Sequence, residues 1–482
     1  MPVKFTLPSV LLFLFSCCCT AATELKKIML PHPPNGDILL LAERKQLLVS
    51  GYSQFSRWLT KVDLTDFSAT LSPLPDNAQF FASAVLAGDK APQLVFLTLD
   101  GVSRLAADGS HAIQLVASDS LYRVLDPNRL RSADFVLNLG SPLSDFLIAD
   151  FQHAHLYRQH ADGSFRHYPL PIPALVQSWR DSPDYTPRQH YIVDVNQDQL
   201  PDLAFVWQGK IQAFLQQQDG SFNTKALVMD WPVTLSTEQE ADQRNDAGRS
   251  YTGQNIDTLR DITDIDGDGV ADLVINREQL ADALERNNSF RIHFGSVTEQ
   301  GLAFNAAPDT TITTDTSPIA VVIDDFNADG RKDFYIPSTH FGVGTIIRVL
   351  LRGSANLDID FYLLSEQRQY PDKADFRQQA TIDVSIGNLR YDMPLFLLAD
   401  TQGNGHKSLL VGEGTDELRL YRHEHKRLFS RKSERIKLAL PRDARKVKVF
   451  DLTGNGKEDL VLPFDSQEDE SRRNQLHILL SQ

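Results

Sequence analysis

Short apolar runs alternate with polar, turn-forming segments along most of this chain. Representative runs are 192–193, 203–206, 321–323, 334–336, 447–450 and 460–462. Apolar runs of this length beside Gly, Asp and Asn predict β-strands rather than helices. The pattern therefore predicts an all-β protein built from many short strands.

A nine-residue pattern with oxygen-bearing side chains at positions 1, 3, 5 and 9 lies between such runs. Its three strong copies contain Asp194, Asn196, Asp198 and Asp202; Asp264, Asp266, Asp268 and Asp272; and Asp325, Asn327, Asp329 and Asp333. Two weaker copies begin at Asp400 and Asp451, and the second keeps Asn455 and Asp459. Recurrence of one motif in one strand context predicts a repeat architecture.

A second periodic signal comes from Asp-Gly-Ser triplets at Asp108, Asp162 and Asp219, which are 54 and 57 residues apart. Asp-Gly favours a tight hairpin turn because glycine tolerates a positive φ. Four antiparallel strands in each of these repeats are typical of a propeller blade. Five blades carry the acidic motif, and segments 38–50, 82–97 and 133–149 show the same strand rhythm without it. We predict eight blades, or seven if segment 38–50 forms no sheet of its own.

The last repeat has room for only three strands before the chain ends. Segment 26–31 ends in Leu-Pro, as the expected outer strand at 436–441 does. We predict that this N-terminal strand completes the last blade and so removes an exposed sheet edge.

Alternating oxygens in a tight loop can point at one centre and form an oxygen-only cation site. Such a site suits Ca²⁺ better than Mg²⁺, because calcium accepts many protein oxygens in a flexible geometry. An EF-hand is excluded because position 12 is Phe205, Ile275 or Ile336 instead of a closing glutamate. Carboxylate count ranks the loop at Asp264 tightest and the loops at Asp400 and Asp451 weakest. The alternative is that these loops are plain turns without a metal.

Composition and net charge indicate a globular protein that does not bind nucleic acid. A chain of 482 residues with 42% hydrophobic and 23% charged residues is globular, and its net charge of −15 disfavours nucleic acid. The cluster His153, His155, His160 and His167 resembles a transition-metal site, but the pattern identifies no complete ligand set. No catalytic residue can be singled out.

The first residues have the pattern of an export signal. Lys4 precedes an apolar stretch at 7–19, and small residues at 20–22 offer a cleavage site. We expect a signal peptide at 1–22 and one mature domain at 23–482, exported to the periplasm, cell surface or medium. Segment 14–17 also resembles a lipobox, so a membrane-anchored lipoprotein acylated at Cys17 is the alternative. The mature chain has no apolar run long enough for a transmembrane segment.

The acidic motif and its strand context resemble the FG-GAP/VCBS repeats of integrin-α-like propellers. The resemblance covers nearly the whole mature chain and implies structural Ca²⁺ bound by the oxygen-bearing residues of the three strong loops, with weaker binding at Asp451, Asn455 and Asp459. It also implies that the opposite face, which carries the long links 173–189, 232–258 and 365–394, binds a partner.

These observations favour a calcium-binding propeller that acts as a protein- or glycan-binding or scaffold module outside the cytoplasm. The alternatives are a polysaccharide lyase or hydrolase on a propeller platform and a structural part of a larger envelope assembly.

Overall fold

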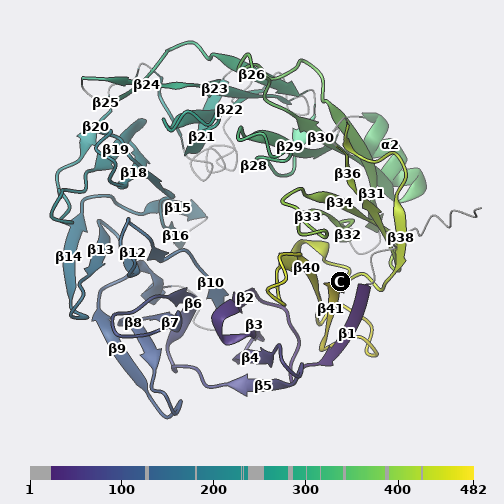
Figure 1. The fold of residues 1–482 in the computed structure, drawn as a ribbon, viewed down its shortest axis with the longest axis horizontal. Helices are drawn as coiled ribbons and strands as arrows, with labels where there is room; N and C mark the ends of the chain where they lie inside the picture. Colours follow the sequence, from purple (N-terminus) through teal and green to yellow (C-terminus); the bar gives the residue numbers. More distant parts are fainter. Residues whose placement is uncertain are drawn as a thin grey trace, which may run out of the picture.

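The computed structural model describes residues 23–124, 130–179, 182–229, 231, 233–236, 255–280, 286–299, 301–314, 316–339, 343–385, 390–424 and 427–482. Eight sheets, each with four antiparallel blade strands, follow one another around a ring (Figure 1). The prediction of an eight-bladed propeller is confirmed. Segment 38–50 forms a blade of its own, so the seven-bladed alternative is wrong.

The blades contain the following strands, from the inner to the outer edge. The first four blades are β2 (Ile38–Leu41), β3 (Gln46–Tyr52), β4 (Arg57–Asp63) and β5 (Ala69–Ser72); β6 (Ala78–Ala84), β7 (Gln93–Thr98), β8 (Gly101–Leu105) and β9 (Ala112–Ala117); β11 (Val136–Leu137), β12 (Asp145–Ala149), β13 (Ala154–Gln159) and β14 (Phe165–Leu170); and β17 (His190–Val193), β18 (Asp202–Trp207), β19 (Lys210–Phe214) and β20 (Leu227–Val228). The last four are β21 (Asn255–Thr263), β22 (Asp272–Leu280), β23 (Arg286–His293) and β26 (Thr310–Thr314); β28 (Val322–Asp324), β29 (Asp333–Thr339), β30 (Ser354–Tyr362) and β31 (Phe376–Ser385); β33 (Phe396–Ala399), β34 (Ser408–Glu413), β35 (Glu417–Tyr421) and β38 (Glu434–Lys437); and β39 (Lys448–Phe450), β40 (Asp459–Phe464), β41 (Gln475–Ser481) and β1 (Thr23–Met29).

The hydrophobic core lies between neighbouring blades. One cluster joins Leu97 of the second blade to Phe146 of the third, and another joins Leu410 of the seventh to Leu462 of the eighth. The second strand of a blade is therefore covered on both faces, and every residue of β29 and β40 is buried. This two-sided burial explains why the sequence shows continuous apolar runs instead of a strict alternation.

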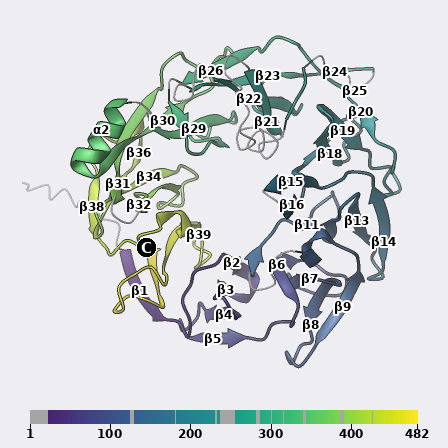
Figure 2. The same cartoon turned by 180° about the vertical axis from the view of Figure 1, so that it is seen from behind.

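The ring closes between the two ends of the described chain. Strand β1 pairs antiparallel with β41, from Thr23 opposite Ser481 to Met29 opposite Gln475. Figures 1 and 2 show β1 as the outer strand of the blade that contains the C-terminus. The predicted N-terminal closure is confirmed, and it protects the edge of β41 by a full strand of hydrogen bonds.

The three Asp-Gly-Ser triplets form turns between the third and fourth strands of their blades. Gly109, Gly163 and Gly220 have φ values of 71°, 83° and 78°, in a region that residues with a Cβ atom rarely adopt. The preceding aspartate accepts the backbone N–H of the following serine at 2.9–3.0 Å in all three. The periodic signal in the sequence therefore identified real hairpins.

Several elements were not anticipated. They are helix α2 (Val343–Arg352), the 3₁₀ turns η1 (Ala42–Arg44), η2 (Leu121–Val124) and η3 (Ala444–Lys446), and the strands β10 (Arg131–Ser132), β15 (Leu175–Trp179), β16 (Ser182–Thr186), β24 (Gly295–Thr298), β25 (Gly301–Phe304), β27 (Ser317–Pro318), β32 (Arg390–Asp392), β36 (His423–Glu424) and β37 (Leu428–Phe429). The inner strand of the second blade also begins earlier than the apolar run at 82–87 indicated.

The predicted signal peptide at 1–22, with Cys17, lies outside the described residues. Within the described residues, no helix is long and apolar enough to cross a membrane.

Candidate metal centre

The five acidic loops occupy equivalent places in five consecutive blades. Each joins the innermost strand to the second strand, at residues 194–201, 264–271, 325–332, 400–407 and 451–458. Because the same pair of strands is joined every time, all five loops lie on one face of the ring, here called the acidic-loop face. The links from an outer strand to the next inner strand lie on the opposite face, here called the link face. The expected long link at 365–394 is wrong, because residues 376–385 form β31 and residues 365–375 join β30 to β31 on the acidic-loop face.

The first aspartate of each loop holds the turn in shape. In the fifth blade, Asp264 accepts the backbone N–H of Gly267 on Oδ1 at 2.7 Å and that of Gly269 on Oδ2 at 2.9 Å. These two glycines have φ values of 78° and 86°, a region where a Cβ atom is unfavourable. The first aspartates of the other four loops accept equivalent backbone N–H groups; they are Asp194, Asp325, Asp400 and Asp451.

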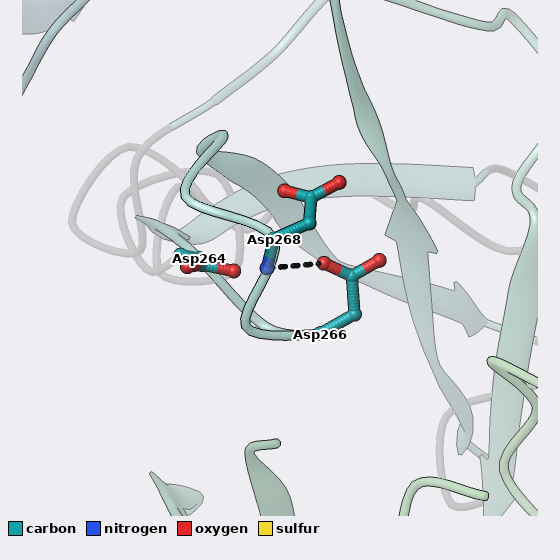
Figure 3. A group of neighbouring side chains, drawn as sticks. All are labelled: Asp264, Asp266 and Asp268. Carbon is teal, nitrogen blue, oxygen red and sulfur yellow. Dashed lines mark hydrogen bonds between the residues drawn. The ribbon is translucent and has the colours of Figure 1, made fainter. Parts of the chain in front are cut away.

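Three carboxylates of the fifth blade converge. One oxygen from each of Asp264, Asp266 and Asp268 can be chosen so that all three lie within 4.8 Å of one another. Figure 3 shows the three side chains around the turn, with the Asp268 N–H directed at Asp266. Burial raises the pKa of Asp266, and the charge of Asp268 raises it further. Such a cluster of like charges with oxygen-only donors fits a hard divalent cation such as Ca²⁺.

The loop of the fourth blade offers an unused ligand atom. Asn196 Oδ1 is buried and has no hydrogen-bond partner, whereas the Nδ2 of the same side chain donates to Asp198 at 3.1 Å. A buried oxygen without a donor is unfavourable, and a cation at the loop centre would satisfy it. The residues of this loop therefore fit the predicted ion.

The ninth residue of the motif has a role that the sequence did not reveal. Asp202, Asp272, Asp333 and Asp459 are each 0% exposed. In each case one carboxylate oxygen accepts the N–H of loop position 2, and the other accepts an N–H at or just beyond the end of the third strand. Each of these side chains therefore hydrogen-bonds to two connections of its blade, an arrangement here called the bracket. Burial raises the pKa of Asp202 to about 6, and those of Asp272 and Asp333 to about 7.

One half of this arrangement occurs in a blade that lacks the acidic loop, where the second carboxylate oxygen faces Arg158 Nε at 3.3 Å instead of a backbone N–H. Asp145 is the first residue of β12, is 0% exposed, and accepts the N–H of Gln159 at 2.9 Å. An aspartate at the start of a second strand was the sequence signal that could have identified this role. The contact to the end of the third strand therefore occurs without an acidic loop, and the ninth residues stay predicted ligands.

Two arginines form ion pairs with carboxylates of the strong loops. Arg368 of the sixth blade forms an ion pair with Asp266, whose side chain is only 3% exposed. Arg331 pairs with Asp329 at 2.6 Å in its own loop. Charge count alone ranked the Asp264 loop first, and this ranking omitted the cross-blade arginine.

The two weak loops keep the fold of the strong ones with fewer charges. Asp400 and Asp451 each bind the backbone of their own turn, and Asn404 donates to Gln402 at 3.1 Å. The turn conformation therefore does not itself require a cation. Convergent carboxylates distinguish the loop at Asp264 from these two.

The histidine cluster is only partly brought together. His167 Nε2 lies 3.0 Å from His155 Nδ1, and the ring of His153 lies 5.9 Å from that of His155. His160 instead closes the neighbouring turn with Ser164 and Gly163 through its backbone. Within the described residues, only Asp264, Asp266 and Asp268 form a group of three or more convergent metal-binding side chains.

No family model matches the chain, and no curated protein sequence matches it. Among solved structures, the Dos1 propeller is similar at 8% identity and a TM-score of 0.44, covering 94% of this chain and 94% of that chain. An Agrocybe aegerita lectin that recognises non-reducing terminal N-acetylglucosamine is similar at 12% identity and a TM-score of 0.42, covering 86% and 94%. A putative 6-phosphogluconolactonase from Bacteroides fragilis is similar at 9% identity and a TM-score of 0.33, covering 85% and 97%. These proteins resemble the chain in fold, and the FG-GAP/VCBS relationship stays a prediction.

Proposed function

We propose that this protein is a calcium-binding β-propeller that acts as a binding or scaffold module outside the cytoplasm. The observation that carries the proposal is the convergence of Asp264, Asp266 and Asp268 on one side of a tight turn. Three carboxylates this close repel one another, and a Ca²⁺ ion between them would neutralise this repulsion. A second Ca²⁺ ion in the loop of the fourth blade would supply the missing contact of Asn196 Oδ1.

Calcium has a structural role in this proposal. The acidic loops of consecutive blades contact each other: Lys332 donates its backbone N–H to Ile265 O at 2.7 Å, and Glu458 donates to Asp400 O at 2.8 Å. A cation that stiffens one loop therefore also stabilises the junction with the next blade. Binding to the folded state alone raises stability by about 2.7 kcal/mol when the free ion is a hundredfold above Kd.

The partner is assigned to the link face. The long connection at 173–189 adds the hairpin β15–β16 there, and irregular connections on a rigid scaffold are where binding residues usually lie. Calcium on one face and a protein or glycan partner on the other is the arrangement we propose. Export by the signal at 1–22 is part of the same proposal.

The decisive experiment compares thermal unfolding of the mature chain in Ca²⁺ and in excess chelator. The test variant is Asp264→Ala with Asp268→Ala. The matched control is Asp162→Ala with Asp219→Ala, which removes the same charge from two exposed hairpin turns. We expect chelation to lower the melting temperature of the wild type and of the control, and to have a smaller effect on the test variant. An identical response of all three proteins to chelation, or no response, would refute calcium binding at this loop.

A further inference from the structure

Three of the four histidines that the sequence groups together lie on one face of the third blade. His153 and His155 are two residues apart at the start of β13, so they point to the same side of the sheet. His167 of β14 pairs with Tyr157, which follows His155 on that side. His155 and His167 are therefore diagonal neighbours across two antiparallel strands.

The side-chain nitrogens of this diagonal pair lie close together. His155 Nδ1 and His167 Nε2 are 3.0 Å apart, and the two rings are tilted by 51°. Two metal–nitrogen bonds of about 2.1 Å that meet at a right angle place their nitrogens about 3.0 Å apart, whereas a tetrahedral angle needs about 3.4 Å. The observed separation therefore fits two adjacent corners of a square-planar or octahedral ion, the geometry that Cu²⁺ and Ni²⁺ prefer.

Asp150 orients the ring of His155 for such a role. Its Oδ2 lies 3.7 Å from His155 Nε2, and a carboxylate beside this nitrogen favours the tautomer that carries the proton on Nε2. The lone pair of His155 is then on Nδ1, the nitrogen that faces His167. Metal-binding histidines have their second nitrogen beside a carboxylate in this way. Arg123 holds the same carboxylate from the other side, with Nη2 3.4 Å from Oδ1.

Tyr157 orients the second ring. It stacks on His167 with 4.6 Å between the ring centroids and 13° between the ring planes. The Tyr157 hydroxyl donates to Ala117 O of the second blade at 3.2 Å. Burial lowers the pKa of both His155 and His167, so the neutral form, which binds metals, prevails at pH 7. His167 is exposed, so an ion can reach the pair from solvent on that side.

We propose that His155 and His167 together bind one divalent transition-metal ion of the Cu²⁺ or Ni²⁺ type, with Asp150 as a positioning residue. Water fills the remaining coordination positions. A direct hydrogen bond between the two neutral rings uses one of their facing lone pairs, whereas an ion uses both. His153 is not a required ligand, because its ring lies 5.9 Å from that of His155.

This site is distinct from the acidic loops in its chemistry. Its donors are ring nitrogens, which suit transition metals, whereas the oxygen-only loops suit Ca²⁺. The inference therefore goes beyond the proposed function and does not depend on it.

The test titrates the mature chain with Cu²⁺ in excess Ca²⁺ and follows binding by calorimetry and electron paramagnetic resonance. We expect one site whose spectrum shows coupling to two ring nitrogens. His155→Gln and His167→Gln should each weaken binding about tenfold or more and leave at most one coupled nitrogen. Asp150→Asn should also weaken binding about tenfold or more, but keep both nitrogens. His111→Gln, which removes an exposed histidine of the second blade, should bind as the wild type does.

Thermal unfolding without Cu²⁺ separates a lost ligand from a lost fold. His167→Gln changes an exposed side chain of the outer strand and should keep the wild-type melting temperature. The proposal is overturned if the protein does not bind Cu²⁺, if the wild-type spectrum shows fewer than two nitrogens, or if His155→Gln and His167→Gln bind as the wild type does. Unchanged affinity in Asp150→Asn would overturn the positioning role of Asp150. Failure of Cu²⁺ binding would leave the calcium proposal standing, because the acidic loops share no ligand with this site.

Discussion

Arg368 forms an ion pair with Asp266, although the two residues belong to neighbouring blades. Arg368 lies between β30 and β31 with a φ of 59°, and its guanidinium lies 4.1 Å from the ring centroid of Phe294. The acidic loop of the fifth blade therefore already has a protein cation beside a carboxylate whose side chain is only 3% exposed.

This contact predicts that Arg368→Gln tightens calcium binding at the Asp264 loop. Removal of a competing charge from a partly exposed ion pair should raise affinity roughly two- to fivefold. Calorimetry in a background with Asp198→Ala and Asp329→Ala isolates this loop. Arg431→Gln, which removes an exposed arginine elsewhere, is the control and should leave the affinity unchanged. Equal affinity in the two variants would show that Arg368 does not compete with the ion.

The bracket formed by Asp459 predicts a loss of stability that is independent of calcium. Asp459 accepts the N–H of Leu452 at 3.0 Å and that of Ser481 at 2.7 Å. Asp459→Ala leaves both donors unpaired and should cost roughly 3 kcal/mol of unfolding free energy. Urea unfolding in calcium and in chelator measures the loss under both conditions. Asp469→Ala, at a side chain that is 75% exposed, should change stability by less than about 0.5 kcal/mol. A loss seen only in calcium would instead make Asp459 a metal ligand.

The closing strand predicts contrasting effects at two adjacent residues. Ile28 is 5% exposed and packs with Leu476 and Ile478 of β41, whereas Met29 is 64% exposed. Ile28→Ala should cost about 2–5 kcal/mol, and Met29→Ala less than about 0.5 kcal/mol. Urea unfolding of the mature chain checks both values. Similar small losses would mean that the ring is stable without β1.

His477 predicts an acid-sensitive closure. It lies opposite Lys27 in the β1–β41 ladder and is 2% exposed. Burial lowers its pKa to about 4 from 6.5, and the charges of Lys27 and Arg472 contribute. Between pH 6.5 and pH 4 the folded state therefore binds fewer protons than the unfolded state. The stability that comes from keeping His477 neutral is fully present above pH 6.5 and is lost as the pH falls towards 4. At about 1.4 kcal/mol per pKa unit, the full effect is roughly 3 kcal/mol.

His477→Gln removes this titration, so the difference in unfolding free energy between wild type and variant should shift in favour of the variant from pH 7 to pH 4. The difference is the useful quantity because Asp202, Asp272 and Asp333 act in the opposite direction. Burial raises their pKa values to about 6, 7 and 7, so their protonation stabilises the folded state as the pH falls. A wild-type-minus-variant difference that is constant with pH would show that His477 does not titrate in this range.

The features that the sequence determined by itself are those that repeat and those that are local. The spacing of Asp108, Asp162 and Asp219 predicted three hairpin turns, and the acidic motif located five inner loops, because a turn is specified by the few residues that form it. The number of blades could be predicted because each blade repeats one strand order. The ring closure could be predicted because the last repeat lacked its outer strand.

Only the tertiary structure decided which chemical groups meet across blades. Gln79 and Pro187 are far apart in the chain and line the same cavity, and Arg368 forms an ion pair with Asp266, more than one blade-length earlier in the chain. The buried bracket at Asp459 also depends on Ser481, in a different strand. These contacts follow from the way neighbouring blades pack. Strand periodicity specifies which residues alternate within one blade, but it carries no information about what the adjoining blade places opposite them.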